Sequence, residues 1–140
     1  MLSSILGANA GIGKVTALEI SKRGARVLML SRNEEKSLPV IREIKEETGH
    51  DVIFYKLNLA SLDSIRSCAN EINSKEPKID ILINNAGIML CPNWKTDDGF
   101  DMQLGTNHLG HFLLTELLMP LIQRSAITGF HPRYSCSLYL

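Results

Sequence analysis

The sequence has no block of like charges. Its 140 residues include 15 basic and 15 acidic side chains, which give a formal net charge of +0, and no run holds five or more charges of one sign. Nucleic acids and anionic membranes are bound through concentrated basic patches. Neither is therefore expected as the main partner of this chain.

Cysteines and long apolar runs are also scarce. The three cysteines, Cys68, Cys91 and Cys136, form no Cys-x-x-Cys motif and no Cys/His cluster. We therefore expect inert thiols in a reducing compartment and no metal site. No apolar stretch approaches the length of about 18 residues that spans a bilayer, and the N-terminus lacks the basic and apolar regions of an export signal. We expect a cytoplasmic protein with no membrane anchor.

The sequence does contain a regular alternation of short apolar runs and helical patterns, and 44% of its residues are hydrophobic, enough for one core. Strands are expected at 2–6, 25–31, 51–57 and 79–83, with helices from the first glycine loop to 23, at 33–48, from 61 onward and at 100–119. This order predicts a Rossmann-type, doubly wound parallel α/β sheet with strand order 3-2-1-4. Its ligand crevice would lie at the carboxyl ends of strands 1 and 4.

Three of these helices show an apolar face in the sequence. Val15, Leu18 and Ile20 fit such a face on the first helix, and Val40, Ile41 and Ile44 on the second. The clearest stripe, on the third, is formed by Ile65, Cys68, Ala69 and Ile72.

Individual residues predict where helices begin and end. Asn33 and Ser61 are expected to cap helix N-termini, and Gly24 and Gly49 to follow helix C-termini. Pro39 makes the first half of the second helix doubtful, and Pro120 is expected to stop the last helix. After residue 124 the pattern fails, so the expected organisation is a partial dinucleotide-binding domain at 1–124 and a divergent tail at 125–140.

A glycine loop follows the first expected strand. The spacing Gly7-x-x-x-Gly11-x-Gly13 lies between that strand and a helix, where a dinucleotide pyrophosphate needs close backbone approach and a helix N-terminus. A glycine-rich connector needed only for tight packing is the alternative. The matching spacing of strand, turn, helix and second strand favours a nucleotide.

The end of the second strand predicts the type of cofactor. NAD-selective sites place an acid there to bind the ribose 2′-hydroxyl, whereas this chain has Ser31 followed by Arg32. A guanidinium can bind a 2′-phosphate, which a carboxylate would repel. We therefore predict NADP(H), with Arg32 as the main contact and Lys36 as a weaker one. The alternative is that Arg32 is a solvated surface residue.

Three motifs in order resemble the short-chain dehydrogenase/reductase superfamily. They are residues 7–14, Gly-Ala-Asn-Ala-Gly-Ile-Gly-Lys; residues 84–87, Asn-Asn-Ala-Gly; and residues 107–112, Asn-His-Leu-Gly-His-Phe. The segments 107–115 and 91–100 further resemble its NADP-dependent, retinol dehydrogenase-like branch. The resemblance covers residues 5–125 and implies the N-terminal half of that fold.

The resemblance also implies which residues form the site. Those expected at the cofactor are Gly7, Asn9, Gly11, Ile12, Gly13, Arg32, Lys36, Asn58, Leu59, Asn85, Ala86 and Gly87. Asn107 matches the family's catalytic asparagine. Asn is a poor residue inside a helix, and Gly105 and Gly110 flank it, so we expect a kink there. His108 and His111 have no third ligand nearby and are expected to be structural or surface residues.

The family's acid/base pair is missing. That pair is a tyrosine with a lysine four residues later, and none of the three tyrosines here has a lysine at that position. Ser135 and Ser137 are not assigned as the family's catalytic serine, because their surroundings do not resemble its strand. The resemblance also places the substrate-binding elements after residue 140, so the fourth strand would lack its neighbour unless residues 133–140 pair with it.

Three functions compete at this point. The first is a form of an NADP-dependent oxidoreductase acting on retinol, retinal or other lipophilic alcohols and carbonyls, which retains cofactor binding without catalysis. The second is a non-catalytic nucleotide-binding or dimerisation module, forming a homo- or heterodimer through helix 100–119. The third, a methyltransferase, is disfavoured because adenosylmethionine sites usually have an acid after the second strand.

Overall fold

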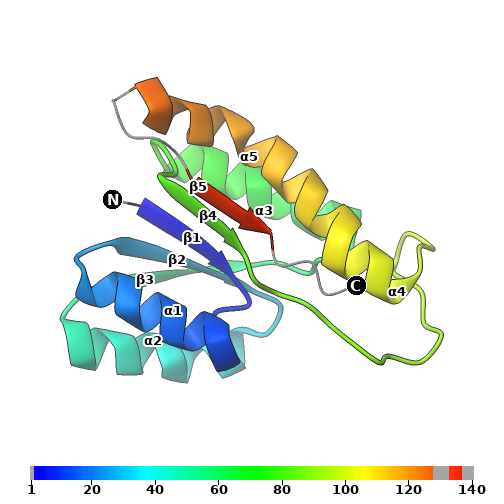
Figure 1. The fold of residues 1–140 in the computed structure, drawn as a ribbon, viewed down its shortest axis with the longest axis horizontal. Helices are drawn as coiled ribbons and strands as arrows, with labels where there is room; N and C mark the ends of the chain where they lie inside the picture. The colour runs from blue at the N-terminus through cyan, green and yellow to red at the C-terminus, as the bar shows by residue number, and fades with distance from the viewer. Residues whose placement is uncertain (1, 128–132, 137–140) are drawn as a thin grey trace.

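A computed structural model describes residues 2–127 and 133–136. Its five parallel strands are β1 (Leu2–Leu6), β2 (Arg26–Ser31), β3 (Val52–Lys56), β4 (Ile81–Asn84) and β5 (Arg133–Cys136), in the order β3-β2-β1-β4-β5. Helices α1 (Gly11–Lys22) and α2 (Glu34–Thr48) cover one face, and α3 (Leu62–Lys75) and α5 (Gly110–Ile127) cover the other (Figure 1). The predicted doubly wound sheet and its strand order are confirmed.

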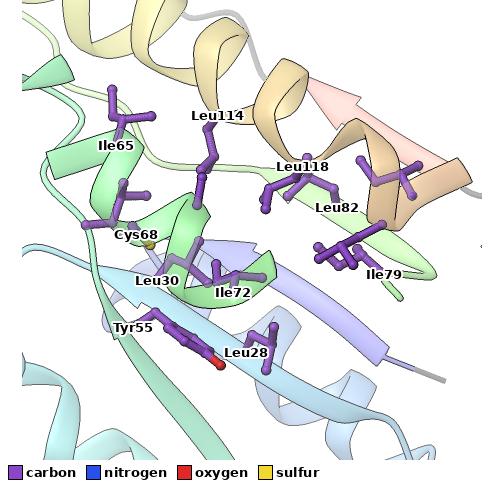
Figure 2. Packing of buried hydrophobic residues seen from close by; sticks show 14 of the residues in the cluster. Leu28, Leu30, Tyr55, Ile65, Cys68, Ile72, Ile79, Leu82, Leu114 and Leu118 are labelled. Carbon is purple, nitrogen blue, oxygen red and sulfur yellow. The ribbon is translucent and has the colours of Figure 1, made fainter. Parts of the chain in front are cut away.

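The core lies in two layers, one on each side of the sheet. Between the sheet and α3 and α5, the predicted stripe of Ile65, Cys68, Ala69 and Ile72 is buried together with Leu114 and Leu118 (Figure 2). On the α1 and α2 side, Ala17, Val40 and Ile44 pack with residues of β2. Strand β2 contributes to both layers, with Leu28 and Leu30 on one face and Val27 and Met29 on the other, as expected for a central parallel strand.

The buried face of α1 differs from the predicted one. Val15 is 59% exposed, whereas Gly13, Ala17 and Ser21 are buried. Small side chains on this face let the helix lie close to the strands, and Leu18 and Ile20 pack only at the edge of the core. The apolar periodicity therefore identified the helix correctly but assigned Val15 to the wrong side.

Pro39 and Pro120, which were expected to disturb their helices, lie inside helices that continue through them. Helix α2 runs unbroken from Glu34, and its first turn is capped by the Asn33 side chain, which accepts a hydrogen bond of 2.9 Å from the Lys36 amide. The last helix was expected to stop near Pro120, but it runs to Ile127. Leu121 and Ile122, just after this proline, are buried, so apolar packing outweighs the lost backbone hydrogen bond.

Strand β4 is not the edge of the sheet. Residues 133–136 form β5, which pairs with it in parallel, with Ile83 opposite Ser135 and Asn84 opposite Cys136. The other residues of the expected tail beyond α5, at 128–132 and 137–140, lie outside the described residues, and Ser137 is among them.

Asp80 joins three segments at the end of the sheet opposite the crevice. Its carboxylate is buried and accepts hydrogen bonds from the Leu2 amide at 2.7 Å, from Lys78 Nζ at 2.8 Å and from the Ser125 hydroxyl of α5. Burial alone would raise the pKa of Asp80, but these donors together outweigh it and lower the pKa below 3.8. The charged form therefore stabilises the fold.

Asp80→Asn should destabilise the protein at pH 7 by about 2 kcal/mol, because an amide cannot replace the charge that binds Lys78 and Ser125. A carboxyl group whose pKa is lower in the folded state than in the unfolded state stabilises the fold at pH values above its unfolded-state pKa. This stabilisation is lost as the pH falls through the folded-state pKa. The wild type should therefore lose stability below about pH 4 more steeply than the variant. Urea unfolding at several pH values measures this, with Asp97→Asn, an exposed carboxylate, as the control. Parallel pH profiles of the wild type and Asp80→Asn would contradict the assignment.

Candidate cofactor cleft

A cleft of about 560 Å³ opens where the carboxyl ends of β1, β2 and β4 meet. It is the crevice that the topology of a doubly wound sheet predicts. The lining includes all the residues expected at the cofactor except Gly13: Gly7, Asn9, Gly11, Ile12, Arg32, Lys36, Asn58, Leu59, Asn85, Ala86 and Gly87. Four separate segments of the chain, 7–12, 32–36, 58–59 and 85–87, thus meet at one place.

Gly13 lies beneath the cleft in the first turn of α1. A Cβ atom on it would overlap the carbonyl oxygen of Gly7 and lie 2.6 Å from the Asn85 amide nitrogen. Gly7 itself has a φ of +67°, and a Cβ there would lie 3.0 Å from Ala86 Cα. The glycine loop and the turn at 84–87 therefore pack tightly together. Glycine is required at both positions by space, and at Gly7 also by its positive φ.

The N-terminus of α1 faces this cleft. Ala10, Gly11 and Ile12 line it, the N-cap Ala10 makes no side-chain capping bond, and the first turn carries no acidic residue. The positive end of the helix dipole is thus directed toward the cleft without a competing carboxylate in that turn.

Basic side chains line the side of the cleft at the end of β2. Arg32 and Lys36 are both exposed and belong to the lining, whereas Glu34 and Glu35 do not. Ser31 is buried and shares a 2.6 Å hydrogen bond with Ser37, which fixes the start of α2 relative to the strand. None of the described residues that line the cleft is acidic.

The loop after β3 forms another wall. The Asn58 side-chain oxygen accepts a 3.2 Å hydrogen bond from the Ala60 amide, and the Asn58 backbone amide donates one of 2.9 Å to the Ser64 hydroxyl. This side chain thus orders the loop that leads into α3. Ala60 and Leu57 also line the cleft and were not predicted, although they are neighbours of the predicted pair Asn58 and Leu59.

The residues that the sequence analysis missed most completely come from the last helical segment. Met102, of the short helix α4 (Met102–Leu104), and Thr106, of the π-helix η1 (Gly105–Leu109), line the cleft together with Ile88. Neither Met102 nor Thr106 belongs to a recognisable motif, so only the folded arrangement shows that they reach this site.

The expected kink at Asn107 is present as the π-helix η1. Such π-helical turns inside α-helices are frequently found at functional sites. The buried Asn107 side chain bonds both backbone groups of Ile88: its oxygen accepts from the amide at 2.9 Å, and its nitrogen donates to the carbonyl at 2.8 Å. A Cβ on Gly110 would lie 2.6 Å from the Leu59 carbonyl oxygen, so this glycine lets the helix approach the cleft wall closely.

The two histidines near Asn107 differ in exposure. His108 is exposed on the surface, and His111 is buried. The described part of the chain contains no group of three or more His, Cys, Asp or Glu side chains placed to hold a metal ion.

Tyr55 does not supply the missing acid/base group. It is 2% exposed and donates a 3.0 Å hydrogen bond to Glu76, which also pairs with Arg26 at the start of β2. Burial, together with Glu76, raises the pKa of Tyr55 to about 12. Its hydroxyl is therefore a structural donor at the end of the sheet away from the cleft.

Within residues 2–127 and 133–136, no helix has both the length and the apolar character needed to cross a bilayer.

Known proteins resemble this chain over most of its length. The model of the short chain dehydrogenase family matches residues 3–129. Human retinol dehydrogenase 13 is 52% identical over 123 residues, which are 87% of this chain and 37% of that protein. Mouse retinol dehydrogenase 11 is 49% identical over 123 residues, or 87% of this chain and 39% of that protein. The chain thus spans well under half the length of these relatives.

Solved structures show the same fold. A protein from Mycobacterium paratuberculosis superposes with a TM-score of 0.76 and 44% identity over 86% of this chain and 42% of its own. A short chain dehydrogenase from Escherichia coli CFT073, complexed with NADPH, gives a TM-score of 0.78 and 31% identity over 89% of this chain and 54% of its own. With the family model matched along nearly all of its length, this chain belongs to the short-chain dehydrogenase family of oxidoreductases.

Proposed function

We propose that this chain binds NADP(H) in the cleft at the carboxyl ends of its strands and does not by itself catalyse turnover. The observation that carries the proposal is the charge of the cleft: Arg32 and Lys36 line one side, the N-terminus of α1 faces it, and none of the described lining residues is acidic. Among the dinucleotides that the family binds, NADP(H) fits this basic cleft best, because its 2′-phosphate adds negative charge.

The residues present fit the two charged parts of this cofactor. Backbone amides at the start of α1 and the glycine loop would hold the pyrophosphate, because Gly11 lines the cleft and no atom lies within 4 Å of the point where its Cβ would stand. Arg32 would bind the 2′-phosphate, with Lys36 as a second cation. Asn58 and Leu59 would lie at the adenine, and the turn at 84–87 beside the ribose. When bound, NADPH supplies the hydride for carbonyl reduction.

Two NADP-complexed relatives support this assignment. The Escherichia coli structure above contains NADPH, and a short chain dehydrogenase from Shigella flexneri 2a was solved with NADP at 31% identity and a TM-score of 0.77. Both proteins that hold these cofactors share the fold of this chain. The retinol dehydrogenases among the relatives suggest retinoid-like or other lipophilic alcohols and carbonyls as substrates of the longer proteins.

The absence of turnover is proposed from the residues. No tyrosine of this chain has a lysine four residues later, and Tyr55 is held in a structural hydrogen bond to Glu76. Asn107 is present and would be the remaining member of the family's proton relay. Among the described lining residues there is no tyrosine, histidine, cysteine or carboxylic acid that could take the place of the family's tyrosine as general acid.

A dimerisation module is the second candidate. Three large apolar side chains near the start of the last helix are exposed: Phe112 by 60%, Leu104 by 51% and Phe100 by 41%. Apolar exposure of this kind on one segment is typical of an interaction surface. The chain would then form a homo- or heterodimer through the helical segment 100–119.

NADPH should bind the purified chain, measured by calorimetric titration, whereas NADH should bind more weakly and S-adenosylmethionine should show no binding. Retinal with NADPH should give no turnover above a protein-free blank. A retinol dehydrogenase relative of full length serves as the positive control for the assay. Lack of NADPH binding would disprove the cofactor assignment, and reproducible turnover would disprove the proposed loss of catalysis.

Arg32→Ala should weaken NADPH binding by about 10- to 100-fold, because a charge-assisted hydrogen bond contributes about 1.5–3 kcal/mol. It should change NADH affinity by less than about threefold, since NADH has no 2′-phosphate. The matched control is Arg42→Ala, an exposed arginine of α2 outside the cleft lining. Equal losses of NADPH and NADH affinity would show that Arg32 does not recognise the 2′-phosphate.

Leu104→Ser combined with Phe112→Ser should shift the chain from dimer toward monomer in sedimentation velocity, because both exposed apolar side chains would be removed from the interface. Gln123→Ser, an exposed polar position on the same helix, should leave the distribution unchanged. A wild-type chain that remains monomeric up to its solubility limit would rule out the homodimer.

A further inference from the structure

His111 is a buried side chain that joins helix α5 to the turn after β4. It is 1% exposed, and its Nε2 lies 2.7 Å from the carbonyl oxygen of Ala86. Its Nδ1 lies 3.3 Å from the Asn84 side-chain oxygen. Both contacts are made to residues 84–86, which lead from the sheet into the wall of the cleft.

The protonation of the ring is fixed by these surroundings. Burial lowers the pKa of His111 below 6.5, the bond to Ala86 opposes this, and nearby His108 lowers it further. The ring is therefore neutral at pH 7 and has a single N–H. Because a carbonyl oxygen can only accept, the short contact with Ala86 places that proton on Nε2, and Nδ1 then has no hydrogen to donate to the Asn84 oxygen.

A further side chain of α5 holds the same turn. Asn84 donates a 3.2 Å hydrogen bond from its amide nitrogen to Thr115, and the Thr115 hydroxyl donates one of 2.8 Å to the His111 carbonyl. His111 and Thr115 are four residues apart, so they lie on one face of the helix. The turn is thus held by side chains from the helix.

Ala86 packs directly against the glycine loop. Its Cα lies 3.0 Å from the point where a Cβ on Gly7 would stand, and both residues line the cleft. The side-chain amide nitrogen of the neighbouring Asn85 lies 2.6 Å from the point where a Cβ on Gly13 would stand. With so little free space, a shift of the Ala86 peptide must move the wall of the cleft or the glycine loop.

We propose that His111 is a positioning residue for the cofactor cleft, which holds the Ala86 carbonyl and thereby sets the distance between the turn at 84–87 and the glycine loop. This inference rests on the proposed binding of NADP(H) in that cleft. His111 does not line the cleft and touches no cofactor, so it acts through Ala86.

A matched pair of variants tests this role. His111→Met and His111→Gln introduce unbranched side chains of similar size, but only glutamine can donate a hydrogen bond to Ala86. His111→Met should weaken NADPH binding about tenfold, the equivalent of one hydrogen bond. His111→Gln should recover affinity to within about threefold of the wild type. If the methionine variant does not fold, His111→Asn replaces it, because this polar side chain is too short to reach the carbonyl.

Leu118→Ala controls for a merely structural effect. This buried residue lies on the same helix, outside the cleft lining and the turn, so its loss should lower the free energy of unfolding without changing the NADPH affinity of the folded protein. If the His111 variants behave like Leu118→Ala, losing stability but keeping wild-type affinity, the positioning role is wrong. Equal effects of His111→Met and His111→Gln on NADPH affinity would also show that the positioning role is wrong.

Hydrogen exchange without cofactor separates this inference from the proposed function. The amides of Asn85 and Ile88, which bond to Ile83 and Asn107, should exchange about tenfold faster in His111→Met. The Gly49 amide, at the far end of α2, should keep its rate relative to the wild type. If the wild type fails to bind NADPH, the proposed function fails, and exchange alone decides whether His111 holds the turn. Unchanged rates at Asn85 and Ile88 would overturn it.

Discussion

The close contact between the glycine loop and the turn at 84–87 determines how the cleft is built. Gly7 and Gly13 meet Ala86 and Asn85 with no room for a side chain between them. This contact joins β1 and α1 to the end of β4, and the Gly7 amide also bonds the Leu30 carbonyl at 2.9 Å, at the end of β2. Strand order, the direction of α1 and the shape of the cleft therefore depend on one crowded point.

The charge of the cleft follows from that geometry. Three parallel strands end together, so the residues that come after them share one edge of the sheet. After β2 this puts Arg32 beside the cleft, and after β1 it puts the N-terminus of α1 there. The structural ion pairs and buried acids lie elsewhere: Glu76 pairs with Arg26 at the start of β2, and Asp80 binds the Leu2 amide at the start of β1. The two ends of the sheet thus differ in function, one for stability and one for binding.

The sequence predicted the strands, their order and the segments that meet at the cleft, because these depend on local apolar runs and on motifs with fixed spacing. It failed where tertiary packing outweighs local preference. Pro120 should end a helix, but Leu121 and Ile122 are buried and the helix continues. Val15 was assigned to the core, yet only small residues fit where α1 meets the sheet. Met102 and Thr106 could not be predicted at the cleft, since they belong to no motif and reach it only through the path of a long loop.

The same architecture is the basis of the proposal that this chain binds a cofactor without catalysing turnover. The cleft is assembled from segments within residues 7–106, and its nearest support, from Asn107 to Thr115, lies just after them. The described lining of the cleft therefore comes from segments that precede α5, with support from the first turns of this helix. In the family, the proton donor is a tyrosine near the reacting carbonyl. Tyr55 cannot take this role, because its hydroxyl donates a hydrogen bond to Glu76 at the other end of the sheet. The proposal that this chain binds without transferring a proton thus rests on the basic cleft that the described residues form and on the absence of a tyrosine from its described lining.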